Sequence, residues 1–223
     1  MKFFLDTANL DEIEDALETG LISGITTNPS LMAKEPKTDF YEHISKIVDM
    51  CELYGEIPLS VEVFATEPHQ ILTQAYHIRT QIPYKKLNIK IPIGYEELKI
   101  INKLSETNVP VNCTCCFTTT QMQLAAAAGA RYVSLFYNRL LDVKGDPLET
   151  LQRTRDFIDS RNLNCEIIVG SIRNAYDVED AWNAGAHIVT AGHAVLKKAT
   201  KHPKTDESVN QFLSDFREWI DNE

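Results

Sequence analysis

The residue with the clearest chemical potential is a lysine inside a run of apolar, β-branched residues. In the run Leu87–Pro92, strand alternation places Lys90 and Asn88 on one face and only leucine and isoleucines on the other. The apolar face suits a layer of covering helices, so we predict that Lys90 points into the interior of the fold. An inward charge is costly and is usually retained for an ion pair or for chemistry.

Two interpretations of an inward Lys90 stay open. The structural one is an ion pair with Glu62 or Asp6, acids that lie near the ends of other β-rich runs. The chemical one is nucleophilic catalysis, because burial lowers the pKa of a lysine and a free amine attacks a ketone to give a Schiff base. Nearby acids oppose that shift, and they are also the proton-transfer groups that the reaction needs. The sequence does not decide which effect is larger.

Further polar residues lie at or near the ends of the β-rich runs. In a barrel of parallel strands, catalytic groups gather at the C-terminal ends of the strands. The candidates are Asp6, Thr26, Thr27, Asn28, Glu62, Lys90, Asn112, Thr114, Ser134, Arg139, Ser171 and Arg173. This placement predicts one polar site at the mouth of a barrel.

Eight β-rich runs alternate with segments whose apolar residues have helical spacing. The runs are Lys2–Thr7, Gly24–Asn28, Leu59–Phe64, Leu87–Pro92, Val109–Phe117, Tyr132–Asn138, Cys165–Ile172 and Ile188–Ala191. They start about every 27 residues, which is the period of a β-α unit. An open doubly wound sheet would favour a G-x-G-x-x-G turn, and none follows any run. We therefore predict the α/β class, a (β/α)8 TIM barrel in a single domain spanning residues 1–223.

One more helical segment follows the eighth β-α unit. The segment Asp206–Asn222 carries an apolar stripe that includes Phe212, Phe216 and Trp219. The barrel is complete without this extra C-terminal helix (206–223). We therefore expect its aromatic face to pack on the barrel wall or on another subunit.

The composition argues against several classes of protein. A net charge of −10 repels phosphate backbones, so we expect no nucleic-acid partner. No apolar run approaches the roughly 18 residues that cross a membrane, and Asp6 interrupts the N-terminal run where a signal peptide would be apolar. We expect no membrane partner and a cytoplasmic protein.

The five cysteines suit a reducing compartment better than a disulfide framework. Cys113, Cys115 and Cys116 lie close together in one predicted strand, where alternation groups Cys116 with Asn112 and Thr114. Adjacent side chains there point to opposite faces, and no zinc-like spacing follows. We interpret the three cysteines as buried small apolar residues and expect no metal.

Several segments resemble those of the small transaldolases, which share a superfamily with fructose-6-phosphate aldolase. The segments are FLDTANLDEI, GITTNPSLM, SVEV, IKIP, VNCT, AGARYVS and HPKTDESVNQFLSDFREW. They occur in the same order and at the corresponding strands from end to end. The resemblance implies an enzyme without a cofactor that acts on sugar phosphates in carbohydrate metabolism, in the pentose phosphate pathway.

The resemblance also implies roles for the matching residues. Lys90 resembles the Schiff-base lysine, and Asp6 is similar to the acid/base that takes the C4-hydroxyl proton of the sugar. Glu62 and Thr114 resemble the pair that holds the proton-shuttling water. The residues expected to bind the sugar are Thr27, Asn28, Asn112, Ser134 and Phe136, and those expected to bind the phosphate are Arg139, Ser171 and Arg173.

Two positions separate transfer from aldol cleavage within this resemblance. The aldolase relatives carry Gln in place of Glu62 and Tyr in place of Phe136. Without the tyrosine hydroxyl, the enamine is expected to wait for an acceptor aldehyde, so both residues favour transfer. Leu135, Asn138 and Gly170 depart from the usual Pro, Gly and Ala of the family. These neighbours of the sugar pocket bear on substrate identity more than on the chemistry.

We therefore predict a transaldolase that moves a dihydroxyacetone unit from fructose 6-phosphate or sedoheptulose 7-phosphate to an aldose phosphate through Lys90. The alternatives are an aldolase that releases free dihydroxyacetone, a transaldolase for another anionic ketose such as a sulfonated one, and a non-catalytic sugar-phosphate-binding barrel. The resemblance also implies a homo-oligomer, a decamer of two pentameric rings in which the C-terminal helix packs on a neighbouring subunit.

Overall fold

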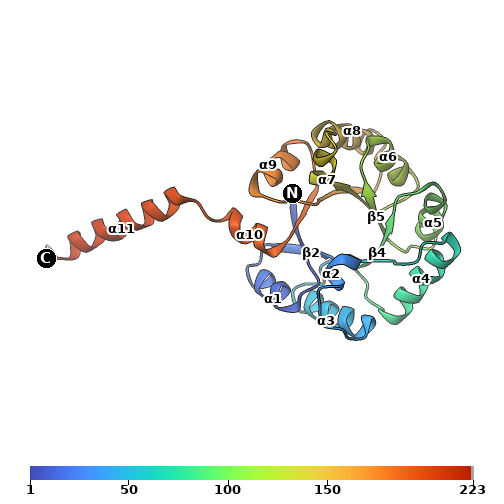
Figure 1. Cartoon of the computed structure of the whole chain (residues 1–223), viewed down its shortest axis with the longest axis horizontal. Helices are drawn as coiled ribbons and strands as arrows, with labels where there is room; N and C mark the ends of the chain where they lie inside the picture. The colour runs from blue at the N-terminus through green and yellow to red at the C-terminus, as the bar shows by residue number, and fades with distance from the viewer. Residues whose placement is uncertain (222–223) are drawn as a thin grey trace.

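Eight parallel strands close into a barrel in the computed structural model, which describes residues 1–221. The strands are β1 (Lys2–Asp6), β2 (Ile22–Thr26), β3 (Leu59–Glu62), β4 (Leu87–Pro92), β5 (Val111–Cys116), β6 (Tyr132–Phe136), β7 (Glu166–Gly170) and β8 (Ile188–Ala191). Each strand pairs with the next one, and β8 pairs with β1 to complete the ring (Figure 1). The predicted (β/α)8 barrel is confirmed.

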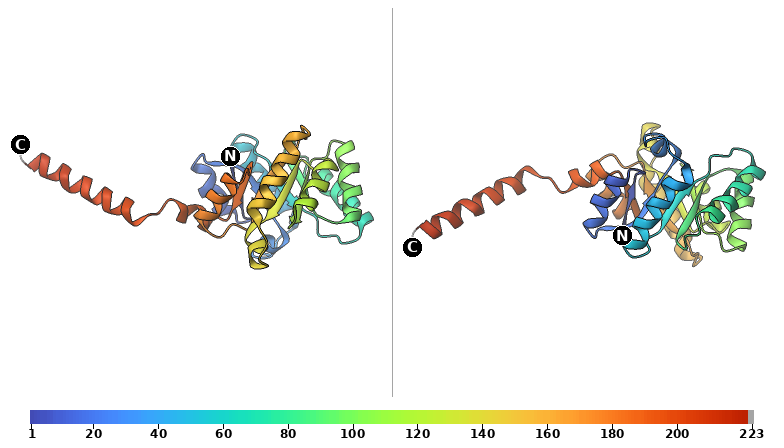
Figure 2. Two further views of the ribbon diagram at one scale, coloured as in Figure 1. Left: turned by 90° about the horizontal axis from the view of Figure 1, so that it is seen from above. Right: turned by 90° about the horizontal axis from the view of Figure 1, so that it is seen from below.

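Helices alternate with the strands, and most of them lie around the outside of this ring, whereas the last one extends away from it (Figures 1 and 2). They are α1 (Leu10–Glu18), α2 (Pro29–Met32), α3 (Phe40–Leu53), α4 (Pro68–Gln81), α5 (Tyr95–Glu106), α6 (Thr119–Ala127), α7 (Tyr137–Asp142), α8 (Pro147–Ser160), α9 (Ala175–Asn183), α10 (His193–Ala199) and α11 (Pro203–Asp221). The strand predicted over Tyr132–Asn138 is too long, because the chain turns into α7 directly after Phe136. That turn brings Arg139 to the C-terminal end of the barrel.

The main core lies between the barrel and the helices. The outward residues of the strands, such as Leu5, Ile25 and Ile89, are buried against the apolar stripes of the helices. In α3, for example, Ile44 and Ile47 are three residues apart and both are fully buried. This packing holds the strands in register and so fixes the positions of their inward side chains.

An apolar layer fills the barrel interior on the N-terminal side of the site residues. Phe4, Tyr132, Ile168 and Ile188 form a separate buried cluster, in which the rings of Phe4 and Tyr132 meet edge to face at 6.3 Å. Gly24 makes room for the Phe4 ring, because a Cβ at this position would lie 2.5 Å from the ring. Each of the four residues lies two positions before a polar or small residue of the site described below, so the site rests on this layer.

Strand β5 departs from regular alternation at Cys115. This residue has a left-handed backbone with φ 59°, and the pairing of β5 with β6 slips by one residue between Cys113 and Cys116. Cys116 therefore joins Cys113 in the outer core and does not share the inward face of Thr114, as regular alternation had predicted. Cys113 and Cys116 are buried as expected, whereas Cys115 is partly exposed.

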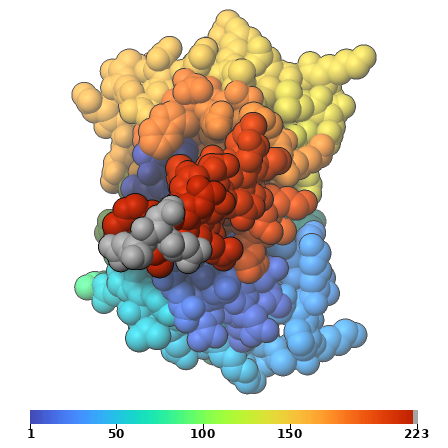
Figure 3. Space-filling view, turned by 90° about the vertical axis from the view of Figure 1, so that its left-hand side faces the viewer, coloured from blue at the N-terminus to red at the C-terminus, as the bar shows by residue number. Residues whose placement is uncertain are grey.

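The C-terminal helix α11 extends away from the barrel (Figures 1 and 2). Viewed from that side, it stands in front of the barrel (Figure 3). Its apolar stripe is exposed, with Phe212 at 69%, Phe216 at 57% and Trp219 at 63%, and the last two rings stack at 5.8 Å. The stripe does not pack on the barrel wall of its own chain. The predicted helix end at Asn222 lies outside the described residues.

Candidate active site

Lys90 lies on β4, in register with Glu62 on β3 and Asn112 on β5. Only 5% of the residue is exposed, and its side chain points into the barrel as predicted. Its Nζ lies 3.2 Å from Glu62 Oε2 and donates a hydrogen bond of 3.0 Å to the carbonyl of Thr27. The ion pair between Lys90 and Glu62 that the structural interpretation predicted is therefore present. The same contact places the lysine amine beside a carboxylate that can accept a proton.

Asp6 ends β1 and lines the same cavity as Lys90. Its Oδ1 accepts a hydrogen bond of 2.7 Å from Thr26 Oγ1, which also lies 2.7 Å from Thr190 Oγ1. Burial raises the pKa of Asp6, while the Lys90 ammonium, the Thr26 hydroxyl and the Lys34 ammonium offset part of that rise. A carboxyl with a raised pKa is suited to accept a proton and return it.

Asn112 is held between two hydroxyls from the neighbouring strands. Its Nδ2 donates to Ser60 Oγ at 3.1 Å, and its Oδ1 accepts from Ser134 Oγ at 2.7 Å. All three side chains are buried. Ser60 and Thr190 were not among the predicted site residues. Both are polar residues on inward faces of apolar strands, which is the signal that could have identified them.

Thr27 and Asn28 mainly hold the local backbone. Thr27 Oγ1 donates to the Ser60 carbonyl at 3.0 Å, so it is the Thr27 carbonyl that contacts Lys90. Asn28 caps α2, and its Oδ1 accepts from the backbone N–H of Leu31 at 3.0 Å. The cap leaves the Asn28 amide nitrogen for a ligand, whereas the Thr27 hydroxyl is already used.

Thr114 is fully buried on β5. Its Oγ1 has no hydrogen-bond partner within the part of the chain that the structure describes, although it acts on the neighbouring Cys115 thiol and offsets part of the rise in the pKa that burial gives that thiol. A buried hydroxyl without a partner carries a desolvation cost, and such groups are rare outside functional sites. The position of this hydroxyl in the cavity that Lys90 lines makes it available to a water molecule or a substrate hydroxyl.

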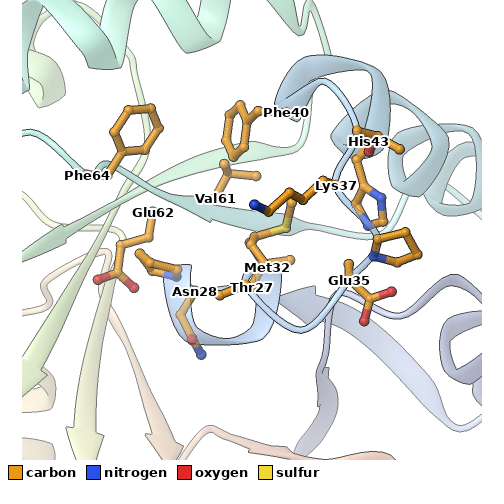
Figure 4. A pocket seen from close by; sticks show the side chains of 14 residues that line it. Thr27, Asn28, Met32, Glu35, Lys37, Phe40, His43, Val61, Glu62 and Phe64 are labelled. Carbon is orange, nitrogen blue, oxygen red and sulfur yellow. The ribbon is translucent and has the colours of Figure 1, made fainter.

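Two cavities share Asn28 in their walls. The smaller one, of 90 Å³, is lined by Asp6, Thr26, Asn28, Lys90, Thr114, Ser134, Phe136, Arg139, Gly170, Ser171 and Thr190. The larger one, of 560 Å³, is mostly apolar, and Figure 4 shows Met32, Phe40 and Val61 around it with Asn28 and Glu62 to one side. The smaller cavity contains Asp6, Lys90 and Thr114, whereas Glu62 and Thr27 line the larger cavity and Asn112 lines neither.

The three residues predicted to bind phosphate do not all reach this cavity. Arg139 and Ser171 line it, and the Arg139 guanidinium lies 4.9 Å from the centre of the Phe136 ring. Arg173 does not line it. Both terminal nitrogens of its guanidinium donate to the carboxylate of Asp142, one of them at 2.8 Å. Asp142 was not among the predicted site residues, because the predicted strand ran to Asn138 and the short helix α7 that carries Asp142 was not predicted.

Two further residues fix the loop that carries Ser171. Asn138 Nδ2 donates to the Ser171 carbonyl at 2.8 Å and to Asp177 Oδ2 at 2.6 Å, and Asp177 also accepts from the backbone N–H of Arg173 at 2.7 Å. Ser171 has a left-handed backbone with φ 60°, which a non-glycine residue adopts only when its surroundings hold it there. Asn138, one of the departures from the family pattern, therefore has a structural role beside the cavity.

A closed (β/α)8 barrel with a buried lysine, a carboxylate at 3.2 Å and a polar cavity at the C-terminal ends of its strands defines a class of barrel enzymes with a lysine-centred site. Residues 3–223 match the family described as Transaldolase/Fructose-6-phosphate aldolase, and the chain belongs to that family. The predicted family is confirmed, and with it an enzyme of the transaldolase class.

Individual relatives agree with this assignment. The chain is 41% identical over 217 residues to a probable transaldolase of Thermoanaerobacter sp., a match that covers 97% of both chains. It is 39% identical to a probable transaldolase of Thermodesulfovibrio yellowstonii, with 97% of this chain and 98% of the other covered. A probable transaldolase of Thermoplasma volcanium is also 39% identical, over 97% of this chain and 96% of its own length.

Within residues 1–221, no three His, Cys, Asp or Glu side chains are grouped so that they could hold a metal ion. Over the same residues, no helix has the length and apolar character needed to cross a membrane.

Proposed function

We propose that this chain is a transaldolase that uses no cofactor and forms a Schiff base at Lys90. The donor is fructose 6-phosphate or sedoheptulose 7-phosphate, and the acceptor is an aldose phosphate. The observation that supports this proposal is the buried Lys90 amine beside the Glu62 carboxylate, in a cavity that Asp6 also lines. The alternative of a purely structural ion pair does not account for the Thr114 hydroxyl left without a partner beside it.

The first stage is formation of the Schiff base. The Lys90 ammonium passes a proton to Glu62 across their 3.2 Å contact, and the free amine attacks the ketone carbon of the donor. The resulting carbinolamine loses its hydroxyl as water, with a proton supplied by Glu62. We assign Thr114 Oγ1, which lines the same cavity as Lys90, the role of orienting the water molecule that carries protons in this step.

Asp6 carries out the second stage. It removes the proton of the C4 hydroxyl, the C3–C4 bond breaks, and the electron pair moves into the iminium to leave a dihydroxyacetone enamine on Lys90. The aldose phosphate leaves as an aldehyde. Attack of the enamine on a second aldehyde forms a new C–C bond, Asp6 returns its proton to the new hydroxyl, and hydrolysis frees Lys90. The raised pKa of Asp6 suits a group that alternates between base and acid.

Polar groups on either side of Lys90 would hold the two ends of the sugar. Asn112, fully buried and bonded to Ser60 and Ser134, would reach the dihydroxyacetone hydroxyls by exchanging one of these bonds, whereas Asn28 lines the cavity and offers its amide nitrogen. Arg139 and Ser171 lie at the end of the cavity where the phosphate would bind. The Phe136 ring lines this cavity without a hydroxyl, so it cannot protonate the enamine, and this favours transfer over release of free dihydroxyacetone.

Borohydride trapping tests this proposal. Incubation with fructose 6-phosphate and borohydride should add one three-carbon unit to Lys90, as peptide mass spectrometry would show. Lys90→Met should abolish both the adduct and turnover, whereas Lys99→Met, which changes an exposed lysine paired with Glu96, should keep the adduct. An intact, folded enzyme that remains unmodified at Lys90 would overturn the proposal. Assays with and without an acceptor aldehyde then distinguish transfer from the release of free dihydroxyacetone. Assays with sulfonated ketoses show whether the enzyme prefers another donor.

We also propose that the chain is a single barrel domain that works as a homo-oligomer, with α11 as the inter-subunit element. The exposed apolar stripe of α11 has no cover from its own barrel, and a helix with such a stripe is stabilised by packing against a partner. The family resemblance suggests two stacked pentameric rings. The free thiols of all five cysteines, each within the described residues, support a cytoplasmic enzyme.

A further inference from the structure

Asp142 is bonded to the guanidinium group of Arg173, which is expected to bind the phosphate of the substrate. It is the last residue of α7 and follows Arg139 by three positions, so both side chains lie on the same side of that helix. Its two carboxylate oxygens accept from the two terminal nitrogens of Arg173, which comes from the loop after β7. Asp142 therefore lies close to both arginines of the predicted phosphate site.

The contact between Asp142 and Arg173 uses the same groups that a phosphate would use. An arginine binds a carboxylate or a phosphate through two parallel N–H donors, so one anion excludes the other from that edge. The hydrogen bond to Arg173 lowers the pKa of Asp142, with the charges of Arg173 and Arg139 adding to it, and Asp142 is accordingly an anion at neutral pH. Asp177 is a second carboxylate whose charge acts on Arg173.

We propose that Asp142 is a specificity-determining residue that competes with the anionic group of the substrate for Arg173. This inference rests on the proposed function, in which Arg139, Ser171 and Arg173 bind that group. A substrate anion must displace the Asp142 carboxylate, which then stays nearby and repels the anion. A dianionic phosphate feels about twice the repulsion of a monoanionic sulfonate. Asp142 therefore weakens phosphate binding and narrows the preference of the site for phosphate over sulfonate.

The Asp142→Asn variant tests this proposal. Calorimetry should show that it binds inorganic phosphate at pH 8 about twofold to fivefold more tightly than the wild type, the range for releasing an exposed ion pair. The gain for methanesulfonate should be smaller. With fructose 6-phosphate, we expect the gain to appear in KM and not in kcat. Asp159→Asn is the matched control, because Asp159 pairs with Arg155 at 2.7 Å and is similarly exposed, at 55% against 52% for Asp142.

Two further variants keep the test decisive. Asp142→Ala should bind phosphate more tightly as well, and Asp142→Asn should give a smaller gain in an Arg173→Gln background, where only the repulsion is relieved. Unchanged or weaker phosphate binding in folded Asp142→Asn would overturn the proposal and assign Asp142 to the positioning of Arg173. The phosphate titrations need no turnover. A failed proposed function would therefore appear as a missing Lys90 adduct, separately from the outcome for Asp142.

Discussion

The unpartnered hydroxyl of Thr114 leads to a prediction in which stability and activity change in opposite directions. Thr114→Val replaces the hydroxyl by a methyl group of similar size. Thr154 provides the matched control, because it is the same residue type and is also fully buried. Thr154 Oγ1, however, donates to the Thr150 carbonyl at 2.7 Å. The two substitutions therefore remove the same atom from a site where it has no partner and from a site where it is bonded.

The magnitude follows from these hydrogen bonds. Removing a desolvated hydroxyl that has no partner should leave the free energy of unfolding unchanged or raise it by up to about 3 kcal/mol, whereas losing a bonded one costs about 1 kcal/mol. For a chain of this size, each 1 kcal/mol corresponds to about 2–4 °C in Tm. Thr114→Val should therefore melt at least about 2 °C above Thr154→Val. Its kcat should fall about 100-fold or more if the hydroxyl serves proton transfer, while Thr154→Val keeps wild-type kcat.

Calorimetric melting of both variants, with a coupled transaldolase assay on the same preparations, checks this prediction. The reasoning fails if Thr114→Val is destabilised as much as Thr154→Val, because the hydroxyl would then be bonded in the free enzyme. It also fails if Thr114→Val retains full kcat. In that case the buried hydroxyl has no part in the reaction, and the role of Thr114 in holding the water molecule must be withdrawn.

Two other predictions concern Asp6 and α11. The raised pKa of Asp6 means that its ionisation opposes folding, so its contribution to stability falls as pH rises from about 4 through the raised pKa and is constant above it. Asp6→Asn should therefore lose activity yet unfold at higher urea at pH 7.5, with the difference disappearing near pH 4. Asp15→Asn should show the opposite sign at pH 7.5, because hydrogen bonds from His193 and Lys197 lower the pKa of Asp15. Truncation after Thr205 should give smaller species than the full chain in light scattering, and unchanged assembly would remove α11 from the interface.

Strand alternation predicted the inward face of the barrel well. Lys90 and Thr114 point inward because the apolar outer face of each strand must meet the helices, and a slip of one residue would bury charge in that layer. The same rule failed at Cys116. The bulge at Cys115 inserts one extra residue into β5, and three neighbouring cysteines contain no signal for a left-handed φ. Regular patterns are readable from sequence, whereas a local backbone irregularity depends on the pairing of strands.

The residues expected to bind phosphate were predicted less completely than the residues around Lys90. Arg139 and Ser171 reach the cavity, but the orientation of Arg173 depends on Asp142, an exposed acid on a short helix that the sequence pattern did not separate from the strand before it. Asp177 and Asn138 act through hydrogen bonds between segments that lie far apart in the sequence. Such contacts follow from the closure of the barrel, so the spacing of residues along the chain cannot reveal them.

The apolar layer of Phe4, Tyr132, Ile168 and Ile188 has a consequence for the order of events during catalysis. The layer lies on the N-terminal side of the site residues, so in the proposed mechanism the sugars reach Lys90 from the C-terminal ends of the strands. The departing and the arriving aldehyde would then use the same part of the site, and the first would leave before the second binds while the three-carbon unit stays on Lys90. The proposed reaction would therefore follow a double-displacement order.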